Sequence, residues 1–576
     1  MFETTGLEKK KKMLFDTLDS SGLIEMTFGN LLNLLEEKYP DNLCVKYCDR
    51  DYTKTFAEFN REVENAAKGF LSLGIGKGDH IAIWATNVPE WLVTFFAAAK
   101  IGAVLVTVNT NYKIFEAEYL LRQSDSKAVV LIDGFKDSDY VGIINKLVPG
   151  LENHDKSKEI DSPLLPRLKR IIYAGKKDEA PGGMIKFSEL YNLGEKFDGN
   201  IFKEIAKSLS VHDVVNMQYT SGTTGFPKGV MLSHYNIVNN GKSIGDCMKL
   251  TPNDKYCICV PFFHCFGMVL SITACITHAS AMIPVDFYTP LDVMNAIQNE
   301  KCTAFNGVPT MFINILDHPE FKNYDFGKLR TGIMAGSVCP EKVMRDAAEY
   351  MNMTEITSVY GLTEASPGCT QHKVDDPFDL RVSTVGRVLP HVEAKITDPQ
   401  TGEALGPGEP GEFCARGYNI MKGYYKMEEA TKQAIDADGW LHTGDIAIVD
   451  ENGFYKITGR LKDMIIRGGE NIYPKEIEEF IYTIPQVSDV QVIGVPSKRY
   501  GEEIMVCVIL KDGENMTEEE LQNAVRASLA RHKVPKYVKF TESFPMTASG
   551  KIQKYKLREE AIEELGLGDE ENGVTA

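Results

Sequence analysis

Apolar segments of two lengths alternate through the first four hundred residues of the chain. Residues 56–70 carry apolar side chains at helical spacing after a capping-box pattern, and residues 81–84 form a short apolar run. A second helical pattern at 89–100 precedes another apolar run at 103–108. Strands that are apolar throughout and separated by helices are typical of a largely parallel sheet covered on both faces. The alternation therefore predicts an α/β fold.

The hydrophobic period changes to two between about residues 380 and 461. Ile446 and Ile448 precede an Asn-Gly pair at 452–453, and Tyr455 and Ile457 follow it. Alternating apolar residues on both sides of Asn-Gly are a strong hairpin signal. This region is predicted to form an antiparallel or β-barrel-like subdomain.

The last hundred residues predict a small α+β unit. A helix is expected to begin at Pro474, strands near 490–495 and 504–510, and a further helix near 517–531. We place the domain boundary between Leu461 and Lys462. The chain is therefore expected to consist of a large N-terminal domain, residues 1–461, and a small C-terminal domain, residues 462–576.

Composition and charge exclude several classes of protein. The 576 residues are 43% apolar, which is ordinary globular usage, and 63 basic against 81 acidic side chains give a net charge of −18. This balance argues against nucleic-acid binding, although it leaves room for a local basic pocket. Twelve scattered cysteines without a CxxC pair suit a reducing compartment. The apolar stretch 91–108 is interpreted as a helix and a strand, and the N-terminus lacks a signal-peptide pattern, so a cytoplasmic protein without a transmembrane segment is expected.

The most informative segment is Tyr-Thr-Ser-Gly-Thr-Thr-Gly-Phe-Pro-Lys-Gly at 219–229. A strand pattern precedes it and a helix pattern follows Ser233. Glycines allow close approach of the backbone to an anion, and the hydroxyls, N–H groups and Lys228 can bind phosphate oxygens. The spacing of the glycines and the residue after Lys228 differ from a Walker A loop. We predict a phosphate-binding loop of another kind.

This loop resembles the signature of the adenylate-forming enzymes, which include acyl-CoA synthetases, adenylation domains and beetle luciferases. Further segments resemble the family's other motifs in the family's order, and together they cover roughly residues 30–555. These segments are PFFHCFG (261–267), NGVPT (306–310), AGS (335–337), YGLTE (360–364), WLHTGD (440–445), GRLKD (459–463), GGENIYP (468–474) and SGK (549–551).

The resemblance implies a two-step reaction. A carboxylate attacks the α-phosphate of ATP to give an acyl-adenylate and pyrophosphate, and the thiol of coenzyme A then displaces AMP. Both steps depend on positioning and charge neutralisation. The family also implies that residues 1–461 are the adenylation domain and 462–576 a mobile lid, with Lys462 at the hinge. The expected cofactor is Mg²⁺, and ATP, coenzyme A and a carboxylic acid are the expected small-molecule partners.

The resemblance also assigns roles to individual residues. The catalytic residues are expected to be Lys551, Glu364, Thr363 and His264. Magnesium ligands are expected at Thr224 and Glu364, and coenzyme A beside Gly468 and Gly469. ATP and AMP are expected to contact Thr220, Ser221, Gly222, Thr223, Thr224, Lys228, Gly336, Ser337, Tyr360, Gly361, Asp445, Ile457 and Arg460.

The sequence says less about the acid. The expected pocket walls are mainly apolar, which favours a monocarboxylic aliphatic acid; they are Phe266, Met268, Val308, Thr310 and Ala335. The whole run most resembles bacterial and mitochondrial medium- to long-chain fatty acyl-CoA synthetases. An aryl acid such as cinnamate or benzoate, a luciferase-type oxygenase and a non-enzymatic acyl-nucleotide sensor stay open as alternatives. So do a homodimer and peripheral contact with a membrane.

Overall fold

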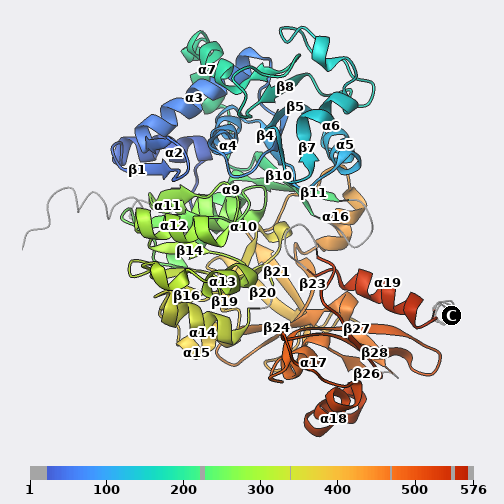
Figure 1. Cartoon of the computed structure of the whole chain (residues 1–576). Helices are drawn as coiled ribbons and strands as arrows, with labels where there is room; N and C mark the ends of the chain where they lie inside the picture. The colour runs from blue at the N-terminus through green and yellow to red at the C-terminus, as the bar shows by residue number, and fades with distance from the viewer. Residues whose placement is uncertain (1–21, 221–226, 338, 468–469, 547–551, 568–576) are drawn as a thin grey trace, which may run out of the picture. The chain divides into compact units, whose positions relative to one another are not determined.

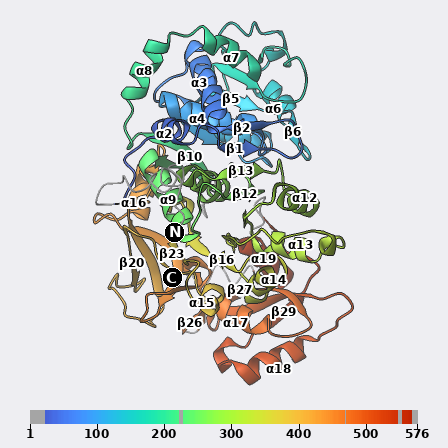
Figure 2. The same cartoon turned by 90° about the vertical axis from the view of Figure 1, so that its left-hand side faces the viewer.

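The computed structural model describes residues 22–220, 227–337, 339–467, 470–546 and 552–567, which form two compact units (Figures 1 and 2). Unit 1 contains the chain up to Ala394 and Ala415–Leu441. Unit 2 contains Lys395–Cys414 and the chain from His442 onward. The chain therefore passes from one unit to the other three times. The predicted domain boundary between Leu461 and Lys462 refers to a C-terminal domain that moves as a lid. It stays a prediction.

Unit 1 holds an eight-stranded sheet with the order β22-β11-β10-β4-β3-β5-β8-β9. The strands from β10 to β9 are parallel, and β10, β11 and β22 are joined in antiparallel fashion. The sequence pattern of apolar strands separated by helices is thereby confirmed. The strands are β3 (His80–Trp84), β4 (Val104–Thr107), β5 (Ser126–Leu131), β8 (Arg170–Tyr173), β9 (Ile185–Lys186), β10 (Val214–Thr220), β11 (Lys228–Ser233) and β22 (Gly423–Tyr424).

A second sheet of unit 1 has seven strands in the order β16-β15-β14-β12-β13-β1-β2. All neighbours from β16 to β1 are parallel, and only the β1–β2 pair is antiparallel. The strands are β1 (Leu43–Lys46), β2 (Thr53–Thr55), β12 (Lys255–Ile258), β13 (Ala281–Pro284), β14 (Ala304–Asn306), β15 (Thr331–Ile333) and β16 (Glu355–Thr357).

Helices cover these sheets. Thr55 caps α3 (Phe56–Ser72) with the predicted capping box to Glu58. Every residue of α4 (Pro89–Ile101) except Glu90 is buried, because it packs between other elements and has no solvent-facing side. The remaining helices of eight or more residues in unit 1 are α2 (Phe28–Lys38), α5 (Ile114–Gln123), α6 (Tyr140–Leu147), α7 (Phe187–Glu195), α8 (Gly199–Lys207), α9 (His234–Cys247), α12 (Pro290–Glu300), α13 (Pro309–Leu316) and α14 (Glu341–Tyr350).

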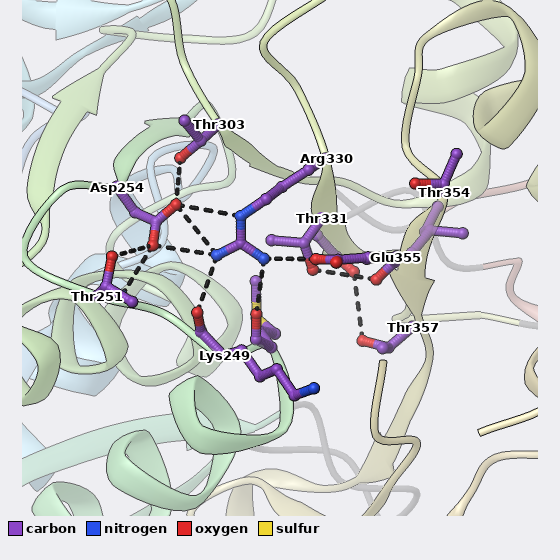
Figure 3. A network of polar contacts seen from close by, with 12 residues as sticks. Lys249, Thr251, Asp254, Thr303, Arg330, Thr331, Thr354, Glu355 and Thr357 are labelled. Carbon is purple, nitrogen blue, oxygen red and sulfur yellow. Dashed lines mark hydrogen bonds and ion pairs between the residues drawn. The ribbon is translucent and has the colours of Figure 1, made fainter. Parts of the chain in front are cut away.

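An ionic network around the buried Asp254 joins the amino ends of four parallel strands of the seven-stranded sheet (Figure 3). Arg330, just before β15, donates to Asp254 before β12 at 3.0 Å and to Glu355 at the start of β16. Thr303, before β14, donates to Asp254 Oδ1 at 2.7 Å. Arg330 also donates to the carbonyl oxygens of Met248 and Lys249 after α9. The network fixes the strand ends opposite to those that carry the predicted site.

Unit 2 contains the predicted hairpin and the small α+β unit. Strands β23 (Leu441–Val449) and β24 (Tyr455–Arg460) pair in antiparallel fashion on either side of the Asn-Gly turn, in a sheet with β20 (Val392–Thr397) and β21 (Gly411–Gly417). The last part of the chain forms β25 (Ile465–Arg467), β26 (Glu470–Ile472), α17 (Pro474–Ile481), β27 (Val487–Ser497), β28 (Gly501–Leu510), α18 (Glu518–Ser528), β29 (Tyr537–Phe540) and α19 (Lys554–Glu564).

The predicted elements of this last part are confirmed, although α18 ends at Ser528, before the expected 531. Across the residues that the structure describes, no helix combines the length and apolarity needed to cross a membrane.

Candidate active site

The seven-stranded sheet carries predicted site residues in four segments. Each segment follows the carboxyl end of a parallel strand. His264 lies beyond β12, Val308 beyond β14, Ala335 beyond β15 and Tyr360 beyond β16. These strands are neighbours in the order β16-β15-β14-β12, so the four segments share one edge of the sheet. Ligands of open α/β sheets bind at this edge. The structure thus brings together residues that lie almost a hundred positions apart in the sequence.

The predicted acyl-pocket residues belong to one apolar cluster. Phe266, Met268 and Ala335 are buried in it, and Val308 packs against it in a half-buried position. Met268 starts the π-helix Met268–Thr273, which follows the short α10 (Cys265–Gly267). A π-turn inside a helix is frequent at functional sites. These four residues are thus apolar side chains of the main core of unit 1 that lie beyond the carboxyl ends of β12, β14 and β15, at the edge where a ligand is expected.

The carbonyl groups around this π-helix are satisfied by side chains. Ser271 donates to the carbonyl oxygen of Phe266 at 3.1 Å, and Thr273 donates to that of Met268 at 2.8 Å. The fully buried Asn306, at the end of β14, donates to the carbonyl oxygen of Leu270 at 3.3 Å. These bonds replace part of the regular helical ladder and hold the irregular segment against the sheet.

His264 precedes α10, and its Nδ1 accepts a hydrogen bond of 3.2 Å from the N–H of Phe266. A neutral imidazole that accepts at Nδ1 carries its proton on Nε2. This assigned tautomer makes Nε2 a hydrogen-bond donor. The geometry suits a residue that orients a carboxylate.

The ends of the predicted phosphate loop are held by a hairpin. Strands β10 and β11 place Thr220 opposite Lys228. Tyr119 donates to the carbonyl oxygen of Pro227 at 3.2 Å, and Tyr219 donates to the side chain of Gln123. The other predicted loop residues, Ser221, Gly222, Thr223 and Thr224, lie outside the described residues.

Tyr424 joins the phosphate loop to the predicted magnesium ligand. Its hydroxyl donates to Glu364 Oε1 at 2.8 Å, and the Lys228 ammonium lies 4.9 Å from the centre of its ring. Burial, reinforced by the Glu364 carboxylate, raises the pKa of Tyr424, so the hydroxyl keeps its proton. Tyr424 is not among the site residues predicted from the sequence. A tyrosine in a Gly-Tyr-Tyr segment carries no distinctive signal, and only the pairing of β22 with β11 places it here.

Thr363 and Glu364 lie in the 3₁₀ turn Thr363–Ala365, which follows β17 (Val359–Gly361). Tyr360 is nearly buried, whereas Gly361 is exposed. A Cβ atom at Gly361 would lie 1.8 Å from the carbonyl oxygen of Pro367, so no side chain fits there. This close backbone approach fixes the turn that presents Glu364.

Gly336 and Ser337 are exposed at the end of the segment after β15. Gly336 has φ +91°, which L side chains rarely adopt, so the turn requires glycine.

The predicted ribose residues form a pair within unit 2. Asp445 on β23 lies opposite Arg460 on β24, and Arg460 Nε lies 3.0 Å from Asp445 Oδ1. Only 9% of the Asp445 side chain is exposed, against 52% of Arg460. Ile457 lies opposite Ala447 on the same hairpin, and Lys475 donates to its carbonyl oxygen.

The predicted hinge residue Lys462 follows in the 3₁₀ turn Leu461–Asp463. Partial desolvation lowers the pKa of its ammonium group, against the opposing influence of Asp463. The predicted catalytic residue Lys551 and the predicted coenzyme A residues Gly468 and Gly469 lie outside the described residues.

Comparisons with known proteins agree with this arrangement. The AMP-binding enzyme family matches residues 35–425, and the C-terminal domain of AMP-binding enzymes matches residues 476–551. The chain therefore belongs to the AMP-binding enzymes, and the predicted resemblance to adenylate-forming enzymes is confirmed.

Relatives of known name cover almost the whole chain. The YngI protein of Bacillus subtilis, which bears the provisional name acyl-CoA synthetase, is 52% identical over 95% of this chain and 99% of its own. The mitochondrial medium-chain acyl-CoA ligase ACSF2 of Danio rerio is 40% identical over 96% of this chain and 91% of its own. The predicted enzyme class, acid–thiol ligase, is the class that these names state.

Solved structures share the fold. The ATP-bound MatB of Rhodopseudomonas palustris is 28% identical, with a TM-score of 0.78, over 93% of this chain and 99% of its own. A fatty acyl-CoA synthetase of Mycobacterium tuberculosis is also 28% identical, with a TM-score of 0.69, over 93% of this chain and 98% of its own. The predicted fold class is thereby confirmed.

Proposed function

We propose that this chain is an AMP-forming acyl-CoA ligase for medium-chain aliphatic acids. The observation that carries the substrate class is that Phe266, Met268 and Ala335 are buried apolar side chains beyond the carboxyl ends of β12 and β15. It agrees with the names of relatives that are 38–40% identical to this chain. An apolar wall binds an alkyl chain through burial of about 0.8 kcal/mol per CH₂ group.

The first step joins the acid to the nucleotide. A carboxylate oxygen forms a bond to the α-phosphorus of ATP while the bond to the pyrophosphate oxygen breaks. We assign charge neutralisation to Lys551 and phosphate positioning to Thr220, Thr363 and Lys228, with the remaining loop residues. His264, as a donor at Nε2, would orient the carboxylate. Asp445 would accept hydrogen bonds from the ribose hydroxyls, with Arg460 holding its carboxylate.

The donor set suits a magnesium ion. Mg²⁺ prefers carboxylate and hydroxyl oxygens and is commonly held by one or two carboxylates together with substrate phosphates. The hydrogen bond from Tyr424 to Glu364 Oε1 orients the carboxylate at the turn beside the phosphate hairpin. We propose that Glu364 and Thr224 hold the ion, which would supply positive charge to the phosphate oxygens.

The second step forms the thioester. The thiol of coenzyme A loses its proton to solvent and its sulfur bonds to the acyl carbon. The bond to the AMP oxygen breaks, and AMP leaves with that oxygen. We propose that rotation at Lys462 changes the lid between the two steps and brings Gly468 and Gly469 to the pantetheine chain.

A panel of acids tests the substrate class. Acyl-CoA formation would be measured from acetate to palmitate and with benzoate, for the wild type and for Ala335→Val. We expect a maximum near hexanoate to dodecanoate that moves to shorter acids in Ala335→Val, because added volume shortens the pocket. Ala304→Val, at the amino end of the neighbouring strand β14, is the matched control and should leave the profile unchanged. A maximum at benzoate would replace the aliphatic assignment by an aryl one.

A further inference from the structure

Three side chains that the proposed reaction does not use converge on neighbouring strands of unit 2. Glu412 and Cys414 lie on β21, and His442 lies on β23, the next strand of the same sheet (Figure 1). Glu412 Oε2 lies 2.9 Å from His442 Nδ1, and Cys414 Sγ lies 3.5 Å from the same nitrogen. The three ligand atoms all lie within 4.8 Å of one another.

Glu412 Oε2 and Cys414 Sγ both contact the same ring nitrogen of His442. A ring nitrogen of neutral imidazole carries either one proton or one lone pair, so Nδ1 serves one partner well. The same geometry excludes a Cys-His-Glu relay, because a relay requires the thiol and the carboxylate to contact different ring nitrogens. A cation placed between the three atoms would satisfy all of them.

We propose that Glu412, Cys414 and His442 bind a divalent cation of the zinc class. Thiolate, imidazole and carboxylate are zinc ligands at about 2.0–2.3 Å, so tetrahedral ligands lie roughly 3.3–3.6 Å apart. The distance of 3.5 Å between Cys414 and His442 matches this spacing, and the 2.9 Å contact would have to lengthen by a few tenths of an ångström. The soft sulfur ligand favours zinc over magnesium or calcium.

The surroundings support such a site. Cys414 is fully buried and Glu412 is 8% exposed, whereas a third of the His442 side chain reaches solvent and offers a path of entry. The second oxygen of Glu412, Oε1, accepts from the N–H of Gly444 at 2.9 Å and so orients the carboxylate. Thr397 Oγ1 lies 3.5 Å from Cys414 Sγ. Outer hydrogen bonds of this kind fix metal ligands in place.

Each of the three ligands has a definite protonation state when the cation is bound. The Cys414 thiol loses its proton to solvent, Nδ1 of His442 binds as a lone pair with the imidazole proton on Nε2, and Glu412 binds as the carboxylate. The cation would cross-link β21 to β23 at His442, which precedes Asp445 on the same strand. The proposal does not rest on the proposed ligase activity, because Glu412, Cys414 and His442 have no assigned role in that reaction.

Cobalt titration of the metal-stripped full-length protein tests the proposal. We expect one Co²⁺ per chain with a thiolate-to-cobalt charge-transfer band and the visible bands of a tetrahedral site. Zn²⁺ should displace the cobalt and raise the melting temperature. Cys414→Ser should abolish the charge-transfer band, and His442→Gln should weaken Zn²⁺ binding by at least about tenfold. Cys339→Ser and Cys48→Ser, which alter more accessible thiols, should leave the band intact.

A wild-type protein that shows no charge-transfer band would overturn the proposal, whatever the folding of the variants. A band that persists in Cys414→Ser and disappears in Cys48→Ser or Cys339→Ser would overturn it as well. Glu412→Gln keeps the size of the side chain and the hydrogen-bond acceptor for Gly444. This variant should fold, and it should bind Zn²⁺ more weakly than the wild type. Unchanged Zn²⁺ affinity in Glu412→Gln would count against the carboxylate as a ligand.

Discussion

Tyr424 donates a hydrogen bond of 2.8 Å to Glu364, and the same aromatic ring lies beneath the ammonium group of Lys228. One side chain thus connects the predicted phosphate loop to the predicted magnesium ligand. The two groups lie 136 residues apart in the sequence, and both need a fixed position before ATP binds.

Removing this hydroxyl should impair adenylation. A hydrogen bond to a charged group contributes about 1.5–3 kcal/mol, so Tyr424→Phe should lower kcat/KM for ATP about 10- to 100-fold and raise the Mg²⁺ concentration needed for half-maximal rate. Both are measured by acid-dependent exchange of pyrophosphate into ATP. Tyr425→Phe, which removes a hydroxyl bonded to Asp125, is the control. An unchanged Mg²⁺ requirement in Tyr424→Phe would remove the positioning role.

The ionic network around Asp254 (Figure 3) should contribute to stability and not to the reaction. Arg330→Met leaves Asp254, which is 5% exposed, without its cation and should cost about 3 kcal/mol of unfolding free energy. The rate per folded molecule should stay unchanged. Arg345→Met breaks exposed ion pairs with Glu341 and Asp379 and should have little effect on denaturant unfolding. Equal losses in the two variants would contradict the role of the network.

His234 should make the protein sensitive to acid. The imidazole is fully buried, its Nδ1 accepts from the N–H of Phe28 at 3.2 Å, and burial lowers its pKa to about 3. An unfolded histidine titrates near 6.5, so the unfolded state binds more protons as the pH falls below that value. The stability contributed by neutral His234 is present above about pH 6.5 and is lost between there and pH 3, by up to about 1.4 kcal/mol per pH unit.

The slope of unfolding free energy against pH measures this effect. His234→Gln keeps a hydrogen-bond acceptor and removes the titration, so its slope between pH 6 and 4 should be shallower. His212→Gln, at an exposed position, is the control and should keep the wild-type slope. Parallel curves for His234→Gln and the wild type would show that another group causes the acid sensitivity.

Lys462→Pro should separate the two half-reactions. Proline restricts the backbone at the predicted hinge, so acyl-adenylate formation should be spared while thioester formation slows. Single-turnover experiments without and with coenzyme A measure the two steps separately. The same substitution at Lys456, inside β24, tests whether any proline in this hairpin has the effect. Equal loss of both half-reactions in Lys462→Pro would contradict a hinge at this position.

The features that could be predicted from the sequence are those whose signal lies within a few neighbouring residues. The helix after Thr55, the hairpin around Asn452 and Gly453 and the helix at Pro474 each carry their signal within a few residues, and each is confirmed. The motifs after β14, β15 and β16 were found by family resemblance, and parallel pairing then explains why they meet.

Contacts that depend on strand pairing between distant segments could not be predicted. Tyr424 reaches Glu364 because β22 pairs with β11, and Arg330 meets Asp254 because β12, β14 and β15 are neighbours. Glu412 and His442 lie on strands whose approach no local pattern signals. Residues of these types are common, and only the fold distinguishes these particular ones.

Isotope transfer tests the central claim most directly. Octanoate labelled with ¹⁸O in both carboxylate oxygens would be incubated with the enzyme, ATP, Mg²⁺ and coenzyme A, and the products analysed by mass spectrometry. Attack of the carboxylate on the α-phosphorus predicts one ¹⁸O atom in AMP for each octanoyl-CoA formed, together with unlabelled pyrophosphate. Label in inorganic phosphate with ADP as the nucleotide product, or thioester formation with unlabelled AMP, would contradict an acyl-adenylate intermediate.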